Sequence, residues 1–409
     1  MQTIRQTAQR TVEFGIYRDG DNNLDMSQGE TLHQTLAVSA ADSRVEFTVE
    51  DTTALRHGQG DIIESGLRTD SFTVADGAVH QPEVEAAKDM ASPQTLAQFV
   101  AHTLDNAQAS GAKQTWIELT DHGAGDGGGL EADSFKGIMP MPQIAVAIAE
   151  GVKIHTEAHP EDAGRGVDGV VANQCLMASL GFADALSHAG VKYLAASPET
   201  MVSPGVPSDV ADAIAKHSDA PDTMGRAIIN DVMREKYGEG IDSWRPAAAF
   251  DVLDLDRSKM QNVERSVKAL NDAIVAQKND AGEVAAIRED AKANEGMVRF
   301  PDATSDMPWH ADRPAIALYD TIAGDERLDP AVRQAAGAAA RAVSSTVVAH
   351  KESADFRPFD GADYRDAAGP TVHFPVKPSQ IDPWGPKISE THNRFFNETD
   401  AAAAERIIA

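Results

Sequence analysis

One cysteine and one histidine of this chain each follow a segment with the composition of a buried strand. Cys175, the sole cysteine, comes just after residues 167–173, and His122 comes just after residues 113–120. Open α/β sheets place their chemistry at the carboxyl ends of parallel strands, so we expect the two side chains to lie at one sheet edge. A thiolate can attack a carbonyl carbon while an imidazole protonates the leaving amine. The pair therefore predicts an acyl-transfer site.

The residues around this pair support the same chemistry. A helix is expected over 176–188, and the positive end of its dipole would favour the thiolate of Cys175. The amide of Gly123, which no side chain shields, can approach a carbonyl oxygen. The competing interpretation is that Cys175 is a small buried apolar residue and His122 an ordinary polar loop residue. The joint placement of the two favours the active site.

Several segments resemble the clostripain family of cysteine peptidases, which have a caspase-like fold. Asp121-His122-Gly123 is similar to the family's histidine motif, and Cys175-Leu176-Met177-Ala178 is similar to its nucleophile motif. Residues 17–24 (YRDGDNNL) resemble its N-terminal strand and acidic turn, and residues 371–375 (TVHFP) resemble the late strand of its core. The resemblance extends over nearly the full length of the chain.

This resemblance implies a cysteine endopeptidase acting on a peptide or protein. Cys175 would be the nucleophile, His122 the general acid and base, and the N–H groups of Gly123 and Cys175 the oxyanion hole. Members of the family cleave after Arg or Lys and hold that side chain with an aspartate two residues before the cysteine. This chain has Asn173 there, and an amide does not neutralise a guanidinium. Glu199, just past a later expected strand, is a possible substitute.

The resemblance also implies maturation by self-cleavage between the histidine and cysteine strands. A polar linker is expected over 153–166, where Lys153 and Arg165 are the possible cleavage sites. The alternative is an ordinary exposed loop. His155 and His159, in the same segment, have the four-residue spacing of metal ligands on a helix. They lack the catalytic glutamate of a zincin, so a solvated linker is the favoured interpretation.

Acidic side chains after the first expected strand match the spacing of an EF-hand calcium loop. The matching positions are Asp19, Asp21, Asn23, Asp25 and Glu30. Leu24 replaces the usual glycine, and a strand rather than a helix precedes the loop, so an Asx-rich turn is favoured. Calcium nevertheless stays a possible cofactor, because the resemblance implies enzymes that are often calcium-dependent. The peptidase chemistry itself requires no cofactor.

A glycine pattern after residues 113–120 raises a different class of function. Gly123-x-Gly125-x-x-Gly128 is similar to a dinucleotide-binding fingerprint, which would indicate an oxidoreductase. No helix is expected to begin directly after it, and Asp126 would repel a pyrophosphate. The glycines are better explained as a flexible rim beside His122.

Strands and helices alternate along the first part of the chain, which predicts an α/β fold with a mostly parallel sheet, here a caspase-like α/β/α sandwich. The expected strands are 12–16, 45–49, 113–120, 167–173, 191–197 and 248–253, with a hairpin at 66–82. The expected helices are 28–40, 92–106, 142–150, 176–188, 208–217 and 222–237.

The sequence texture changes near residue 255. Helices are expected at 260–274, 281–295 and 329–351, then a strand at 370–376 and a helix from Asp400. This pattern predicts a peptidase core over residues 1–255 and a mainly helical C-terminal extension over 256–409 that packs on it.

The composition limits the partners. The 409 residues carry a net charge of −28, which argues against nucleic acid and anionic membrane surfaces as partners. No apolar run reaches the ~18 residues of a membrane span, and the first residues lack the apolar region of a signal peptide. The expected location is cytoplasmic, or outside the cell by a route without a conventional signal peptide. An inactive caspase-like protein that binds peptides or proteins remains the alternative function.

Overall fold

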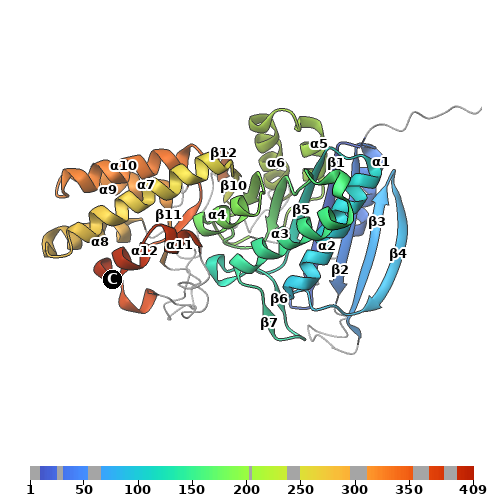
Figure 1. Ribbon diagram of the computed structural model, residues 1–409, viewed down its shortest axis with the longest axis horizontal. Helices are drawn as coiled ribbons and strands as arrows, with labels where there is room; N and C mark the ends of the chain where they lie inside the picture. Colours follow the sequence, from blue (N-terminus) through green and yellow to red (C-terminus); the bar gives the residue numbers. More distant parts are fainter. Residues whose placement is uncertain are drawn as a thin grey trace, which may run out of the picture.

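The computed structural model describes residues 10–24, 31–53, 66–201, 205–236, 249–294, 311–352, 368–381 and 394–409. A nine-stranded sheet runs through the described part of the chain, in the order β12-β10-β9-β8-β5-β1-β2-β3-β4 (Figure 1). Its strands are β1 Val12–Gly20, β2 Val45–Thr53, β3 Arg68–Ala75, β4 Ala78–Ala86, β5 Gln114–Thr120, β8 Gly169–Asn173, β9 Tyr193–Ala196, β10 Ala249–Asp254 and β12 Val347–Glu352.

The five central strands, β9-β8-β5-β1-β2, are parallel, and β3, β4, β10 and β12 join them antiparallel at the two edges. Every residue of β1 is buried, as expected for a strand with neighbours on both sides and helices on both faces. Val12, Phe14 and Ile16 lie in one apolar core and Tyr17 in the other, because successive side chains of a strand point to opposite faces.

Helices cover both faces of this sheet (Figure 1). The core on one face includes residues of α2, α3 and α4, and the core on the other face includes residues of α1, α5 and α6. Their bounds are α1 Thr31–Ala41, α2 Pro93–Ser110, α3 Met141–Ala158, α4 Leu180–His188, α5 Asp209–His217 and α6 Pro221–Lys236. The expected α/β sandwich with a mostly parallel sheet is therefore confirmed.

The C-terminal region builds a third apolar core from its own helices. These are α7 Arg257–Ala276, α8 Ala281–Ala293, α9 Ala315–Gly324, α10 Pro330–Ser344, α11 Arg394–Glu398 and α12 Ala401–Ile408. Among the helices of the described residues, none combines the length and apolar character needed to cross a membrane.

One expectation for this region was wrong, and a second was right in type but too long. The helix expected over 329–351 ends at Ser344, and residues 347–352 form β12, which pairs with β10 at the edge of the central sheet. The β-branched pair Val347 and Val348 favours a strand there. The strand expected over 370–376 is shorter, β13 Thr371–His373, and it pairs with β11 Asp312–Pro314. The C-terminal region thus contributes one strand to the main sheet and a small sheet of its own.

The polar linker expected over 153–166 was also largely wrong. Helix α3 continues to Ala158, because its buried positions Ile144, Ile148, Gly151 and His155 keep a helical spacing. A Cβ placed on Gly151 would lie 2.6 Å from the Cβ of Val100 on α2. The glycine therefore lets α2 and α3 pack closely, which buries one face of the segment that was expected to be a loop.

Glu13 is fully buried in β1 and makes stability depend on pH. Burial raises its pKa to about 8, although the Thr48 hydroxyl donates a hydrogen bond to it over 2.6 Å. The folded state then keeps a proton that the unfolded state loses near the ordinary pKa of 4.5. The free energy of unfolding therefore falls as the pH rises from 4.5 to 8, by at most about 1.4 kcal/mol per pH unit.

We accordingly expect Glu13→Gln to remove this part of the pH dependence, because glutamine does not ionise. Chemical denaturation at pH 5, 6.5 and 8 should show the variant gaining stability relative to the wild type at each step, with Glu161→Gln, at an exposed site, as the control. A difference between Glu13→Gln and wild type that is the same at all three pH values would contradict this expectation.

Candidate active site

The loops after β5 and β8 meet at the carboxyl edge of the sheet. A Cβ placed on Gly123 would lie 2.0 Å from the backbone O of Cys175 and 2.7 Å from its backbone N. Only glycine permits this approach, since real Cβ contacts are never so short. The Gln174 side chain also donates a hydrogen bond to the backbone O of His122 over 3.0 Å. The structure therefore brings the two motifs together, as their positions in the sequence predicted.

Cys175 lies in a tight turn and not in a helix. Leu176 has a φ of 65°, and α4 begins at Leu180 after its N-cap Ser179. The helix expected over 176–188 therefore begins four residues late, and its dipole, which acts within about one turn, does not account for a reactive thiolate. The N–H of Met201 instead donates to Sγ of Cys175 over 3.1 Å, and an N–H interacts more strongly with a charged acceptor than with a neutral one.

Two backbone hydrogen bonds fix this turn to the segment after β9. The N–H of Leu176 donates to the O of Glu199 over 2.9 Å, and the N–H of Ala178 donates to the O of Ser197 over 2.9 Å. Both bonds are local consequences of the parallel β8–β9 pairing, which places the ends of the two strands side by side. Cys175 remains half-buried at the top of this arrangement.

His122 is held by the turn after β1. Its Nε2 lies 2.7 Å from Oδ1 of Asn23, and the Asn22 side chain donates to Asp121 over 2.7 Å. The buried Asp121 carboxylate also accepts the N–H groups of His122 and Glu131. Burial, with Asp19 nearby, raises the pKa of Asp121. Asn22, Asn23 and Asp121 are thus positioning residues for the histidine.

Sequence reasoning did not find these roles, although a signal was present. Asn23 was expected as a calcium ligand, and its contact with His122 joins residues 99 positions apart. The resemblance of residues 17–24 to a family motif did indicate that this turn belongs to the site. It could not show which asparagine faces the imidazole, because that depends on how β1 and β5 pair.

Two other residues proposed as calcium ligands already accept hydrogen bonds from the protein through their carboxylate oxygens. The N–H of Asp21 donates to Oδ1 of Asp19 over 3.0 Å, which forms an Asx turn. The Asp21 carboxylate accepts the hydroxyl of Ser134 over 2.7 Å, and burial raises the pKa of Asp19 to about 8. Asp25 and Glu30 lie outside the described residues. Calcium binding stays a prediction.

Asn173, the expected pocket residue, is buried at the end of β8, between β5 and the segment that precedes α5. Its Nδ2 donates to Glu118 over 3.0 Å, and its Oδ1 accepts the N–H of Val206 over 2.9 Å. Burial raises the pKa of Glu118 to about 7, and the hydrogen bonds from Asn173 and Thr120 oppose that shift. A second carboxylate, Glu199, is 1% exposed and follows β9. The chain therefore places two buried carboxylates around the turn of Cys175, one of them in contact with Asn173.

The residues proposed for self-cleavage lie in different surroundings. Lys153 is on the exposed face of α3, paired with Glu150 over 2.9 Å, so a protease would have to unwind the helix to cleave there. Arg165 follows the short helix η4 (Pro160–Asp162) and donates to the backbone O of Ala112 over 2.9 Å. Of the two, Arg165 alone lies outside regular structure.

The glycine loop lacks the helix that a dinucleotide fingerprint requires. Gly125 begins a short 3₁₀ turn, Gly128 has a φ of 123°, and the N–H of Ala124 donates to the O of Gly128 over 2.9 Å. Two short strands follow, β6 Glu131–Ala132 and β7 Gly137–Ile138. The loop folds back on itself beside His122 instead of opening a phosphate site.

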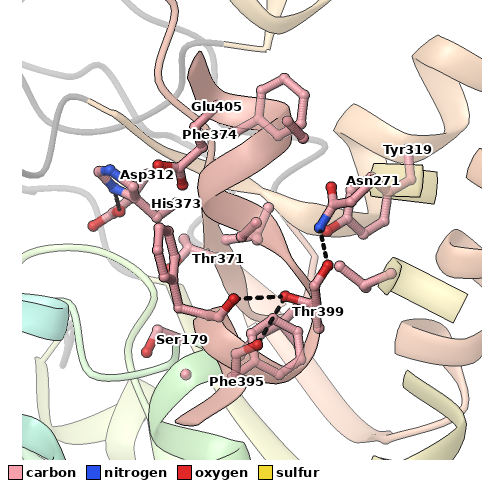
Figure 2. Close-up of a pocket in the computed structure, with 17 residues that line it drawn as sticks. Ser179, Asn271, Asp312, Tyr319, Thr371, His373, Phe374, Phe395, Thr399 and Glu405 are labelled. Atoms are coloured by element: carbon pink, nitrogen blue, oxygen red, sulfur yellow. Dashed lines mark hydrogen bonds and ion pairs between the residues drawn. The ribbon is translucent and has the colours of Figure 1, made fainter. Parts of the chain in front are cut away.

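A pocket not expected from the sequence lies where the C-terminal helices meet the start of α4 (Figure 2). Ser179, Thr371, His373 and Phe395 contribute to its lining, and Oδ1 of Asp312 lies 3.1 Å from Nδ1 of His373. Asp312 also lies close to the loop that follows His122, because a Cβ placed on Gly125 of that loop would lie 3.3 Å from Oδ2 of Asp312. The pocket therefore borders the back of the histidine loop.

No family model and no curated protein matches this chain. Solved structures do. A secreted C11 cysteine protease from Bacteroides thetaiotaomicron, in complex with an irreversible peptide inhibitor, superposes with a TM-score of 0.62 at 15% identity, covering 96% of this chain and 99% of that one. An inactive zymogen C11 protease from Parabacteroides distasonis gives 0.61 at 14% identity, covering 97% and 99%.

Both proteins belong to the clostripain family that the motifs resemble. At this level of identity the likeness shows a common fold over nearly the whole chain. The expected caspase-like architecture is thereby confirmed, including the C-terminal helices.

Proposed function

We propose that this chain is a cysteine endopeptidase of the clostripain family. The observation that carries the proposal is the close packing of Gly123 on the main chain of Cys175, which sets His122 and the sulfur at one sheet edge. The shared fold with two C11 cysteine proteases supports it. Peptide inhibitor binding by the first of these supports a peptide or protein as the substrate.

In the proposed reaction, Sγ of Cys175 gives its proton to His122, attacks the carbonyl carbon of the scissile peptide bond and forms a thioester as the C–N bond breaks. His122 gives its proton to the leaving amine, then takes one from the water that hydrolyses the thioester. The N–H groups of Gly123 and Cys175 are the proposed donors to the oxyanion. The contact of Nε2 with Asn23 favours the tautomer in which Nδ1 is the basic nitrogen.

Proposed self-processing centres on Arg165. The Parabacteroides protein is described as an inactive zymogen, which supports a maturation step here. Arg165 follows η4 in the segment between the histidine and cysteine strands, and Lys153 lies within a helix.

The secreted Bacteroides neighbour favours export of this chain over a cytoplasmic location.

For the residue before the cleaved bond, we propose that the pair of Asn173 and Glu118 replaces a single aspartate. The Glu118 carboxylate accepts a hydrogen bond from the Asn173 amide, so ionisation of Glu118 would set a negative charge beside the proposed pocket. Since the pKa of Glu118 is about 7, this carboxyl group would be protonated at acidic pH, and cleavage after a basic residue would then be weak. It would increase as the pH rises through 7.

We expect Asn173→Asp to shift the preference toward arginine, because a carboxylate would then face the pocket directly. The ratio of kcat/KM for an Arg peptide to that for the matching Ala peptide should rise at least ~10-fold, about 1.4 kcal/mol of differential binding. Asn294→Asp, at the end of α8, is the matched control. An unchanged ratio in the Asn173 variant would remove this residue from the pocket.

A positional-scanning peptide library tests the function as a whole, with purified protein and with or without calcium. Cleavage at defined positions that disappears on alkylation of the thiol supports the peptidase. Binding of peptides without cleavage at any position would reject the peptidase and favour an inactive binding protein.

A further inference from the structure

Two histidines and an aspartate converge where the end of α3 packs on α2. His155 lies in the last turn of α3 and His159 is the residue that caps this helix, with ring centroids 5.1 Å apart. Asp105 on α2 faces both, its Oδ1 lying 2.6 Å from Nδ1 of His155 and 3.4 Å from Nε2 of His159. We propose that these three side chains form a site for a divalent transition metal ion, with zinc as the best fit.

The surroundings of His155 favour a positive charge at its imidazole ring, which either a proton or a bound metal ion can supply. Its side chain is fully buried, and both ring nitrogens face carboxylates, Nδ1 toward Asp105 and Nε2 toward Asp162 at 3.4 Å. A neutral imidazole has one N–H, so one of these contacts sets a nitrogen lone pair against a carboxylate oxygen. A metal ion between Nδ1 and Asp105 converts that repulsion into two coordinate bonds. The sequence interpretation of a solvated linker was wrong for this residue, which lies in the helix interface.

The spacing suits tetrahedral zinc after a small adjustment. Ligands at ~2.0–2.1 Å from zinc lie roughly 3.3–3.4 Å apart in a tetrahedron. The Asp105–His159 separation of 3.4 Å already has that value, and one ligand atom from each of the three residues lies within 4.8 Å of the others. The shorter contact of Asp105 with His155 must open, and Asp105 is 42% exposed, so its side chain has room to move. The exposed side of the site leaves the fourth position to water.

A second carboxylate orients the buried ligand. Nε2 of His155 can donate its proton to Asp162, which fixes the tautomer with Nδ1 bare for the metal, the arrangement that outer carboxylates impose on zinc-bound histidines. Asp162 is itself held by Arg165. Imidazole and carboxylate donors without a thiolate suit zinc, nickel or cobalt better than calcium or magnesium.

One other cluster of similar composition occurs in the described residues, and it already contains a cation. Asp184, His188 and Glu264 converge near the start of α7, but the guanidinium of Arg257 lies 2.6 Å from Glu264 and 3.5 Å from Asp184. Within the described parts of the chain, no Arg or Lys is among the ion pairs of the three ligands of the Asp105 cluster. Charge therefore favours a metal at the Asp105 cluster only.

The test is zinc titration of the tag-free, metal-stripped full chain carrying Cys175→Ala, so that the active-site sulfur cannot bind the metal. Calorimetry should give one equivalent of zinc with a Kd of ~10 µM or below. His159→Gln and Asp105→Asn should each weaken binding at least ~10-fold, and Asp162→Asn should weaken it by about 10-fold. His102→Gln, an exposed histidine on α2, should leave the affinity unchanged. Cobalt in place of zinc should give the visible absorption of a four-coordinate ion.

Absence of binding at this affinity would overturn the proposal. So would equal affinity in His159→Gln and the parent chain, which would place the zinc elsewhere. Both substituted ligands are partly exposed, so folding of these variants is expected and can be verified by their melting temperatures. The result is independent of peptidase activity, since the titration uses a chain that lacks the nucleophile.

Discussion

Replacing Cys175 with alanine is expected to abolish peptide hydrolysis, with a loss of at least about 10⁴-fold in kcat. The reason is that no other described residue at this sheet edge offers a thiol, and water cannot take its place in forming the thioester. The sulfur is half-buried in a turn held mainly by backbone hydrogen bonds, so the fold should tolerate the loss of one atom.

The measurement is steady-state cleavage of the best library peptide by wild type and variant, with the melting temperature as the check on folding. A variant that melts within about 2 °C of the wild type and has lost activity supports the nucleophile. Undiminished cleavage by a folded Cys175→Ala protein would show that the observed hydrolysis comes from another group or a contaminant.

Gly123→Ala is expected to have the second largest effect. Its Cβ would meet the backbone O of Cys175 at 2.0 Å, and a backbone atom cannot turn aside as a flexible side chain can. The two loops must separate, which moves His122 and the proposed oxyanion donors away from the sulfur. Misplacement of about 1 Å at a reacting centre can lower rates by about 10²-fold, so we expect a loss in kcat of that size or more.

Gly164→Ala is the matched control, because a Cβ there would meet nothing within 4 Å. Activity and melting temperature should both be close to wild type in the control. In Gly123→Ala, kcat should fall far more than the melting temperature predicts for an unfolded fraction. Equal kcat in the two variants would mean that the close contact of the loops has no part in catalysis.

The sequence could predict that the histidine and cysteine motifs lie close together, because this proximity depends only on the order and type of the two strands before them. Two buried strands in a parallel sheet, each followed at once by a chemically active residue, place those residues at one edge. The observed register pairs Thr120 with Asn173, the last residues of the two strands. The glycine after the histidine was expected to allow a close approach, and its neighbour proved to be the main chain of Cys175.

The supporting contacts could not be predicted, because they join distant parts of the chain. Asn23 reaches His122 across 99 positions, and Met201 reaches Cys175 across 26. The start of α4 depends on the left-handed backbone of Leu176, a conformation that its side chain does not favour and that the surrounding bonds impose. The prediction from local helix propensity therefore began this helix at residue 176, too early in the chain.

Errors in segment type had a different cause. Residues 153–158 are polar on the outside, which suggested a linker, but they continue α3, which packs on α2 through Gly151 and His155. For residues 347–352 the prediction extended the preceding long helix too far, although Val347 and Val348 favour the strand that pairs with β10. At residues 153–158, by contrast, a tertiary contact outweighed the local pattern.

The central claim, that the sulfur of Cys175 is activated beside His122, is tested most directly by the rate at which iodoacetamide alkylates the native chain at neutral pH, with the modified residue identified by mass spectrometry. We expect Cys175 to react at least ~10-fold faster in the native protein than in the urea-unfolded chain, and this advantage to be lost in His122→Ala. A native rate equal to or below that of the unfolded chain would contradict the proposed active site.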